Sequence, residues 1–392
     1  MSLPESPEIP GAVRAIVERL ERAGHEAWCV GGALRDAALG HRPSDVDVAT
    51  SATPAEVRKL FRRTVAVGER FGTVGVLDKA GVLHEVTTFR RDVETDGRHA
   101  VVAFGASLEE DLARRDFTIN ALAYHPERHE WRDPFGGAAD LEQGTIRAVG
   151  TPVERFREDY LRILRALRFS ARFGFAIEPA TWEAIRAEAA GLAGISAERV
   201  RDEWFKGLRS ARAVSALAGL WLESGAAAVW LAGLADGLAL EPSISSPPRD
   251  PVLLSVLLLP DPAAALRRLR GSNAEIARAE RLGAAPAGPS GTDPRSVRRW
   301  LAESDEAADD LLRLVELRTG APASWAAVAV EIRRRGDPIA RRDLALRGDD
   351  LMALGFQGPG VGRVLDGLLD RVLDDPALNT RDRLLALARE MA

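Results

Sequence analysis

The first candidates for a chemical role are two aspartates, Asp45 and Asp47, which are separated by one residue. Side chains alternate along a strand, so an extended segment would point both carboxylates to one side and Val46 and Val48 to the other. Carboxylate oxygens are ligands that Mg²⁺ favours in proteins. The pair therefore indicates a Mg²⁺ site, although an isolated Asp-x-Asp is more often a solvated loop or a capping element.

A glycine pair, Gly31 and Gly32, ends thirteen residues before Asp45 and precedes a predicted short helix that reaches Gly40. Glycines allow backbone N–H groups to approach a phosphate at the positive end of a helix, and Arg35 can add a guanidinium. A glycine pair alone is usually only a turn. Its conjunction with the aspartates favours nucleotidyl transfer, in which a triphosphate and its metal ions must meet.

A third carboxylate, Glu85, lies in the second of two β-rich runs, 71–77 and 82–89, which a turn at 78–81 joins into a predicted hairpin. A strand beside the aspartate strand could bring Glu85 to the same site. The alternative, a charge on an edge strand, is about equally well supported by the sequence.

The elements that must position these residues can be read from periodicity and turn signals. An amphipathic helix spans 8–24, a strand follows at 27–31, and Thr53 is an expected N-cap before Pro54. The polar segment 90–111 is expected to be a mobile surface loop. The α/β portion should close with a turn-rich connector that begins at Trp131.

From Glu154 onward the pattern becomes helical, and residues 155–172 hold six arginines. On a continuous helix Asp159, Arg162 and Arg165 share one face, which Arg168 continues. The apolar face of this helix is predicted to consist of Leu161, Leu164, Leu167 and Phe169.

Another helix is expected from Ala197 to Leu208, after Ser196 as N-cap, and the rest of the chain reads as alanine- and leucine-rich helices. Breaks at 241–251 and 283–294 are the best linker candidates. The stretch 349–365 is predicted to be a helix, a glycine-rich turn and a helix. Such a turn can bind a nucleic-acid phosphate, but a plain helical hairpin explains it slightly better.

Composition limits the classes of protein that remain. A chain of 392 residues with 46% hydrophobic content can form two to four domains, and it shows no membrane span or signal pattern, so we expect a cytoplasmic protein. Its single cysteine, Cys29, excludes a disulfide framework and a cysteine zinc cluster. No histidine follows His129, which excludes a histidine-dependent phosphohydrolase domain in the C-terminal part. The net charge of −5 does not by itself indicate nucleic-acid binding.

Five motifs occur in an order that resembles the class II tRNA nucleotidyltransferases, the bacterial and eukaryotic CCA-adding enzymes, whose relatives include bacterial poly(A) polymerases. They are Gly-Gly-Ala-Leu-Arg-Asp at 31–36, Asp-Val-Asp at 45–47, Arg-Arg-Asp-Phe-Thr-Ile-Asn-Ala at 114–121, Asp-Pro-Phe-Gly-Gly-Ala-Ala-Asp-Leu at 133–141 and Glu-Asp-Tyr-Leu-Arg-Ile-Leu-Arg at 158–165. The resemblance covers roughly residues 26–210. Segment 67–73 and the C-terminal glycine-rich turn resemble the tRNA-directed members more than the polyadenylating ones.

The resemblance implies an α+β protein with an N-terminal nucleotidyltransferase head at 1–145, built on a small mixed sheet. An all-α neck at 146–210, body at 211–335 and tRNA-binding tail at 336–392 would follow. Its implied activity is addition of CMP and AMP from CTP and ATP to the 3′ end of tRNA. The open alternatives are CC-adding, A-adding or poly(A) activity, and a non-catalytic tRNA-binding protein. Oligomeric state is left open, and the full-length segment 90–111 favours complete CCA addition.

The same resemblance assigns roles to individual residues. Asp45 and Asp47, with Glu85 as a candidate, would hold two Mg²⁺ ions, and Asp116 and Asn120 would contact the sugar. The nucleotide would also be bound by Gly31, Gly32, Arg35, Arg114, Arg115, Arg165 and Arg168.

Base choice has a physical explanation in this scheme. Cytosine and adenine each present an amino donor beside a ring-nitrogen acceptor, whereas uracil and guanine present the reverse. A carboxylate beside a guanidinium therefore pairs with C or A, and Asp159 and Arg162 would supply these groups. The alternative is an ordinary intrahelical ion pair between the two.

Overall fold

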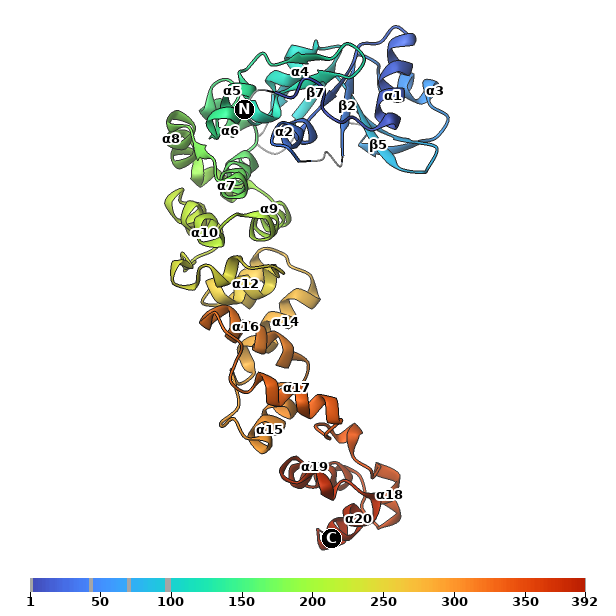
Figure 1. Ribbon diagram of the computed structural model, residues 1–392, viewed down its shortest axis with the longest axis vertical. Coiled ribbons are helices and arrows are strands. Elements are labelled where there is room, and N and C mark those ends of the chain that lie inside the picture. The colour runs from blue at the N-terminus through green and yellow to red at the C-terminus, as the bar shows by residue number, and fades with distance from the viewer. Residues whose placement is uncertain (1–2, 42–44, 69–71, 96–99, 392) are drawn as a thin grey trace. The chain divides into compact units, whose positions relative to one another are not determined.

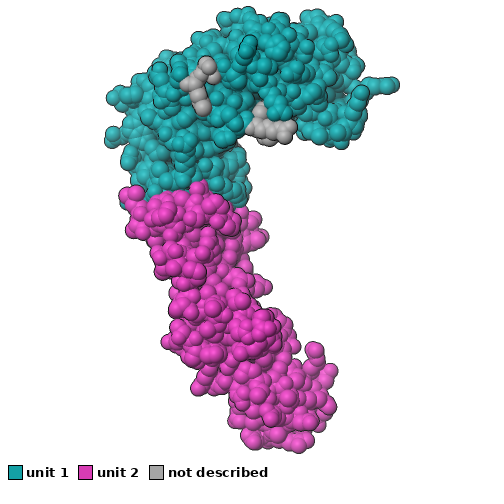
Figure 2. Space-filling view, viewed as in Figure 1, with its two compact units in different colours: residues 1–236, 268–270 teal, residues 237–267, 271–392 magenta. Residues whose placement is uncertain are grey.

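The computed structural model describes residues 3–41, 45–68, 72–95 and 100–391 (Figure 1). The chain forms two compact units: residues 1–236 with 268–270, and residues 237–267 with 271–392 (Figure 2). The α/β elements and the adjoining helices belong to the first unit, and the second unit is helical.

A seven-stranded mixed sheet with the strand order β3-β4-β5-β2-β1-β8-β9 forms the centre of the first unit. Only the β2–β5 pair is parallel; the other neighbours are antiparallel. The strands are β1 (Ala27–Val30), β2 (Asp47–Thr50), β3 (Thr64–Gly68), β4 (Thr73–Leu77), β5 (Leu83–Thr88), β8 (Ala123–His125) and β9 (Glu130–Arg132). The small mixed sheet and the β4–β5 hairpin predicted from sequence are confirmed.

Helices cover the sheet because both faces of its central strands are apolar. One core cluster joins α1 (Gly11–Arg22), α2 (Gly32–Ala38) and α3 (Pro54–Leu60) to the strands. A second joins Trp28 and Ala49 to α4 (Leu108–Ala113). The predicted cap of α3 is present: the Thr53 hydroxyl accepts from the Glu56 backbone N–H.

The expected loop at 90–111 was wrong in its secondary structure. Strands β6 (Arg90–Thr95) and β7 (Ala100–Phe104) pair antiparallel, and α4 follows them. The Val-Val-Ala-Phe run at 101–104 explains the difference, because such residues favour strands even when their neighbours are polar. Residues 96–99, at the centre of the expected loop, lie outside the described residues, as do 69–71 within segment 67–73.

Short elements connect the sheet to the helices. These are α5 (Gly137–Gln143), β10 (Thr145–Ile146), β11 (Ala176–Ile177) and the 3₁₀ turn at Thr118–Asn120. The Thr118 hydroxyl donates to Asp140 Oδ2 at 2.6 Å, which ties that turn to α5. A Cβ on Gly137 would lie 2.2 Å from the Thr118 carbonyl oxygen, so α5 can approach the turn only with a glycine there.

The remaining helices of the first unit are α6 (Pro152–Glu158), α7 (Leu161–Phe173), α8 (Pro179–Glu188), α9 (Ala197–Ser210), α10 (Val214–Glu223) and α11 (Ala226–Trp230). Leu161, Leu164, Leu167 and Phe169 are buried, as predicted. The single continuous helix expected through 154–169 was wrong, because Asp159 adopts an extended conformation (φ −155°, ψ 101°) between α6 and α7. Tyr160 packs so closely over Gly191 that a Cβ there would be 2.1 Å from its ring.

The second unit contains α12 (Pro251–Leu258), α14 (Asn273–Ala284), α15 (Pro294–Ser304), α16 (Ala308–Thr319), α17 (Ala326–Arg335), α18 (Gly348–Ala353), α19 (Pro359–Asp374) and α20 (Arg381–Glu390). Helix α13 (Pro262–Arg268) lies largely in this unit and ends in the first. Two apolar clusters stabilise the unit, one around α15 and α16 and one around α19. The predicted helix, glycine-rich turn and helix at 349–365 are present as α18 and α19. Within the described part of the chain, no helix has the length and apolar character that crossing a membrane requires.

The close approach at Gly137 leads to a stability test. Gly137→Ala should destabilise the protein by about 2–3 kcal/mol, since the backbone of the Thr118 turn must move. Gly219→Ala is the matched control: apart from the backbone of its own helix, nothing lies within 4 Å of the added Cβ, and alanine in the interior of α10 should be neutral or stabilise by about 0.5–1 kcal/mol. Chemical unfolding of both variants measures the difference, and equal stabilities would contradict the packing described.

Candidate active site

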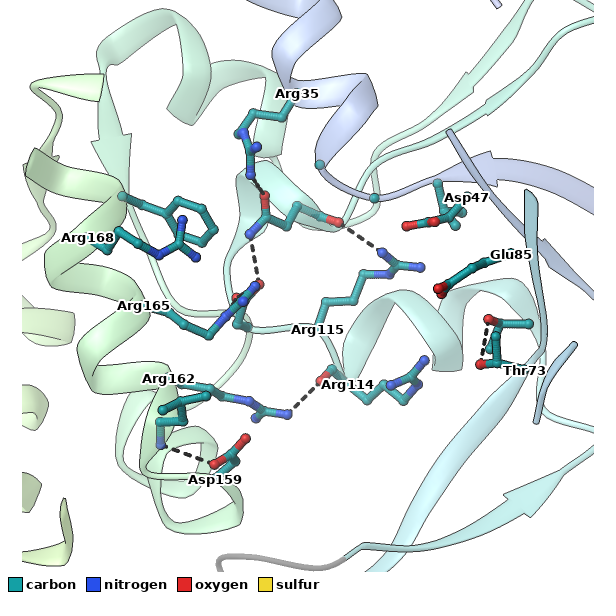
Figure 3. A pocket seen from close by; sticks show the side chains of 18 of the residues that line it. Arg35, Asp47, Thr73, Glu85, Arg114, Arg115, Asp159, Arg162, Arg165 and Arg168 are labelled. Carbon is teal, nitrogen blue, oxygen red and sulfur yellow. Dashed lines mark hydrogen bonds and ion pairs between the residues drawn. The ribbon is translucent and has the colours of Figure 1, made fainter. Parts of the chain in front are cut away.

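A cavity of about 630 Å³ opens in the first unit, between the sheet and α7 (Figure 3). Its volume suits a small-molecule ligand. Its lining is dominated by charged side chains from both the sheet and the helices. It includes every site residue predicted from sequence except Asp45, namely Gly31, Gly32, Arg35, Asp47, Glu85, Arg114, Arg115, Asp116, Asn120, Asp159, Arg162, Arg165 and Arg168.

The sheet supplies two neighbouring carboxylates. Asp47 begins β2 and Glu85 lies in β5, each one position before the paired residues Val48 and Val86. Of the two alternatives left open by the sequence, the structure shows the one in which a neighbouring strand places Glu85 beside Asp47. Burial raises the pKa of Asp47 to about 6, and the nearby charge of Glu85 acts in the same direction.

Asp45 is placed differently from Asp47. It is exposed, precedes β2 and does not line the cavity, although its charge also contributes to the raised pKa of Asp47. Among the residues described, no three acidic, histidine or cysteine side chains lie close enough to form a complete metal site. The donors still fit Mg²⁺ in kind, because a hard cation would stabilise the half-buried Asp47 carboxylate beside the charges of Glu85 and Asp45.

A buried network surrounds Asp116. Its Oδ2 accepts from Arg165 Nε at 2.7 Å, and its Oδ1 accepts from Asn120 Nδ2 and the Phe117 backbone N–H, both at 2.9 Å. Burial alone would raise the pKa of Asp116, but the Arg165 charge and these hydrogen bonds hold it at about 2. Asp116 is thus a permanent anion that orients Arg165 and Asn120.

Arg35 is already engaged with protein groups. Its Nη1 donates to Asn120 Oδ1 at 2.5 Å, and its Nε and Nη2 donate to Asp36 Oδ1. The guanidinium lies 5.0 Å from the centre of the Phe169 ring. This structure therefore shows Arg35 orienting Asn120, rather than presenting the free fork expected from sequence.

Arg114 and Arg115 share one buried partner, Asp111. Arg114 Nε donates to Asp111 Oδ1 at 3.0 Å, and Arg115 Nη2 donates to Asp111 Oδ2 at 3.3 Å. In Figure 3 the Arg115 guanidinium lies next to the carboxylates of Asp47 and Glu85. Its Nη1 donates to the Asn120 carbonyl oxygen at 3.4 Å. We did not identify Asp111 from the sequence, although its spacing of three and four residues from the arginines is a typical helical ion-pair signal.

Asp159 and Arg162 both line the cavity but are not paired with each other. Asp159 Oδ2 accepts from Arg199 Nη2 at 2.7 Å, and its Oδ1 accepts from the Leu161 backbone N–H. Arg162 donates to Glu158 at 2.7 Å and to the Arg114 carbonyl oxygen at 2.9 Å. Their placement one turn apart on one helix was wrong, and so was the alternative of an ion pair between them.

Helix α9 supports this wall of the cavity. Arg199 binds Asp159, and one turn later the buried Glu203 accepts from Arg168 Nε at 2.6 Å. Sequence analysis predicted the helix but missed both residues, because nothing in a helical pattern tells which neighbour a polar face meets. Sequence analysis also missed Thr73, Thr87 and Arg172, which line the cavity.

Two protein-family models and several curated proteins are similar to this chain. Residues 27–147 match the poly A polymerase head domain, and residues 174–237 match the probable RNA and SrmB-binding site of polymerase A. The CCA-adding enzyme of Lacticaseibacillus paracasei is 36% identical over 98% of this chain and 97% of that protein. The enzyme of Latilactobacillus sakei is 37% identical, covering 98% of both chains. A shorter match, 50% identical over 56% of this chain, covers 54% of the Lactiplantibacillus plantarum enzyme.

Solved structures of CCA-adding enzymes also resemble this chain over nearly its whole length. The Bacillus stearothermophilus CCA-adding enzyme in complex with CTP has a TM-score of 0.81 and 34% identity, covering 97% of this chain and 96% of that one. The Thermotoga maritima enzyme complexed with tRNA, at 19% identity and a TM-score of 0.70, covers 98% of this chain and 97% of that one and supports the fold. The chain therefore belongs to the CCA-adding enzyme family of the class II tRNA nucleotidyltransferases.

Proposed function

We propose that this protein adds CMP and AMP to the 3′ end of tRNA, using CTP and ATP without a nucleic-acid template. The observation that carries the proposal is a single cavity with two kinds of lining. The sheet contributes the carboxylates of Asp47 and Glu85, and the helical side contributes an acceptor, Asp159, and a donor, Arg162. Nearly full-length relatives named CCA-adding enzymes support it, as does a related structure that contains CTP. A cytoplasmic location is part of the proposal.

Asp47 and Glu85, assisted by Asp45, are proposed to hold Mg²⁺, which when bound would favour deprotonation of the tRNA 3′-hydroxyl and neutralise charge on the departing pyrophosphate. Arg115 and the backbone at Gly31 and Gly32 would bind the triphosphate. A Cβ on Gly31 would lie only 2.9 Å from Asp47 Oδ2, so the turn and the carboxylate are in close contact. This contact would bring the triphosphate and the carboxylates together.

Asp159 and Arg162 are proposed to recognise the Watson–Crick edge of the base. Each Asp159 oxygen accepts one hydrogen bond from the protein, and a carboxylate oxygen has a second lone pair for the amino group of cytosine or adenine. Arg162 would donate to the ring nitrogen. Asp116 and Asn120 are proposed to contact the sugar, with Arg35, Arg114, Arg165 and Arg168 maintaining the charge of the cavity.

The domain division expected from sequence also remains a proposal. A nucleotidyltransferase head at 1–145 and a neck at 146–210 would together form the site. The body at 211–335 and the tail at 336–392 would bind the tRNA away from its 3′ end. The polar segment 90–111, and within it residues 94–98, is proposed to contribute to the AMP step.

The first test concerns activity. Purified protein with Mg²⁺ and labelled CTP or ATP should extend tRNA that ends at the discriminator base, at C or at CC, and should stop after CCA. Asp47→Ala should reduce incorporation by about a thousandfold or more, since a metal site contributes several kcal/mol to such a transfer. Glu127→Ala, at an exposed position outside the cavity, is the control and should retain activity. Long A tails would instead indicate a poly(A) polymerase, and tRNA binding without incorporation a non-catalytic protein.

A second test uses the raised pKa of Asp47, about 6 in the folded state against about 3.9 in an unfolded chain. Ionisation therefore destabilises the metal-free fold, and the stability present below pH 4 is lost as pH rises through 6. In EDTA, Asp47→Asn should be more stable than the parent by about 1–3 kcal/mol above pH 7, and the difference should shrink toward pH 4. Urea unfolding across this range measures it. A difference independent of pH would argue against crowded carboxylates.

The third test concerns base choice. Asp159→Ala should relax discrimination against UTP and GTP, because the carboxylate that repels their carbonyl oxygens is gone; about 1–3 kcal/mol is at stake. Arg162→Ala should lower incorporation of CTP and ATP alike. Steady-state incorporation of all four nucleotides by both variants measures these two effects. If Asp159→Ala rejects UTP and GTP as the parent does, the proposed role of Asp159 is wrong.

A further inference from the structure

The order of the strands gives the cavity two distinct sides. Along the sheet from β1 to β4, the lining residues are Gly31 after β1, Asp47 on β2, Glu85 on β5 and Thr73 on β4. The glycine turn and Arg115 lie on one side of the carboxylates. On the other side, the lining residues of β5 and β4 besides Glu85 are two threonines. On the strands themselves, the lining side chains therefore change from carboxylates to hydroxyl groups, while Arg90 and Arg114 line the cavity from outside β4 and β5.

The two threonines form a defined pair. Thr73 and Thr87 are directly opposite in the β4–β5 register, and their hydroxyl oxygens lie 3.0 Å apart. Thr87 is two residues from Glu85, so both point to the cavity face of the sheet. One hydroxyl of the pair donates to the other, which leaves one free O–H donor and several lone pairs. The pair can both donate to and accept from a further hydroxyl group.

Apolar side chains extend the same face beyond the threonines. Val65 lies opposite Gly75, and Gly75 lies opposite Glu85, so the three form one row across the sheet. Val67 and Leu83 lie over Gly75, since a Cβ there would be 2.8 and 2.6 Å from them. Val65, Val67 and Leu83 are nevertheless 44%, 43% and 37% exposed. These three exposed side chains carry no charge and lie on the same face of the sheet as Glu85, which lines the cavity.

We propose that the Thr73–Thr87 pair and this apolar surface bind the 3′-terminal ribonucleotide of the RNA acceptor. The 2′-hydroxyl would bond to the threonine pair, and the base would lie over Val65, Val67 and Leu83. This inference rests on the proposed function.

The direction of the reaction supports this placement. In phosphoryl transfer the attacking and leaving oxygens lie on opposite sides of the phosphorus. The glycine turn and Arg115, on one side of the carboxylates, suit the triphosphate, so the 3′-hydroxyl would approach from the threonine side. A ribose whose 3′-oxygen reaches Asp47 and Glu85 has its 2′-oxygen on the adjacent carbon. A neutral hydroxyl pair beside the carboxylates is suited to that group, and nucleobases stack well on uncharged surfaces.

A purely structural role makes a different prediction. Cross-strand threonine pairs stabilise hairpins slightly, and valine, which has the same shape and a high strand propensity, should replace them with little loss of fold. Thr73→Val and Thr87→Val therefore remove the hydroxyls while leaving the sheet intact. Unfolding temperatures of both variants close to that of the parent verify this condition.

The experiment combines enzyme and substrate variants. Acceptor RNA ending in a ribonucleotide is compared with the same RNA ending in a 2′-deoxyribonucleotide that keeps its 3′-hydroxyl. For the parent, kcat/KM should fall about three- to tenfold with the deoxy acceptor, as expected for one or two neutral hydrogen bonds. Thr87→Val should show a similar loss with the ribose acceptor and little further loss with the deoxy acceptor, because the same interaction is missing. KM for CTP should not change.

Controls separate this inference from the proposed function. Thr64→Val, on β3 and outside the cavity, should behave as the parent, and Val65→Asn should raise KM for the acceptor alone. The proposal would be overturned if the losses from Thr87→Val and from the deoxy acceptor multiplied independently. It would also be overturned if the parent used both acceptors equally well, or if Thr87→Val changed only the kinetics with CTP. A parent that incorporates no nucleotide would instead refute the proposed function.

Discussion

The arrangement of the cavity depends on buried carboxylates that hold its arginines. A guanidinium removed from water is unfavourable unless a charged partner and hydrogen bonds compensate for lost hydration. Asp111 serves Arg114 and Arg115, Asp116 serves Arg165, and Glu203 serves Arg168. Removing one such carboxylate would leave a partly buried cation without its partner. The cluster of positive charge therefore exists only because an acidic set, drawn from several elements, surrounds it.

This arrangement fixes the arginines before any ligand binds. Side chains already held by ion pairs and ring contacts need not reorganise around a triphosphate, and such preorganisation is the main electrostatic contribution to catalysis in many enzymes. The Phe169 ring is central to it, because the guanidinium groups of Arg165 and Arg168 lie 5.2 and 4.2 Å from its centre. One helix, α7, thus presents a row of cations while its opposite side packs into the core.

The order of the strands arranges the groups that line the cavity along one direction of the sheet. Because β2 and β5 are parallel neighbours, Asp47 and Glu85 lie together, and because β4 is next to β5, hydroxyl and apolar groups follow on the same face. A sheet face on which carboxylates are followed by hydroxyl and apolar groups can bind two different substrates in a defined orientation. Strand order, rather than any single residue, creates this asymmetry.

The sequence alone determined much of the protein. Alternation and turn signals predicted the strand before Gly31, the hairpin that carries Glu85 and the buried face of α7, because these depend on local periodicity. The residues named from the short motifs, together with Glu85 from the hairpin, line one cavity, with Asp45 as the exception. Tertiary structure decided the partners. Asp159 leaves the helix because Arg199 holds its carboxylate and Tyr160 packs over Gly191, which lies thirty-one residues further along the chain. Helical spacing describes only one helix, whereas these contacts arise from the packing of several, so no pattern within residues 154–169 could reveal them.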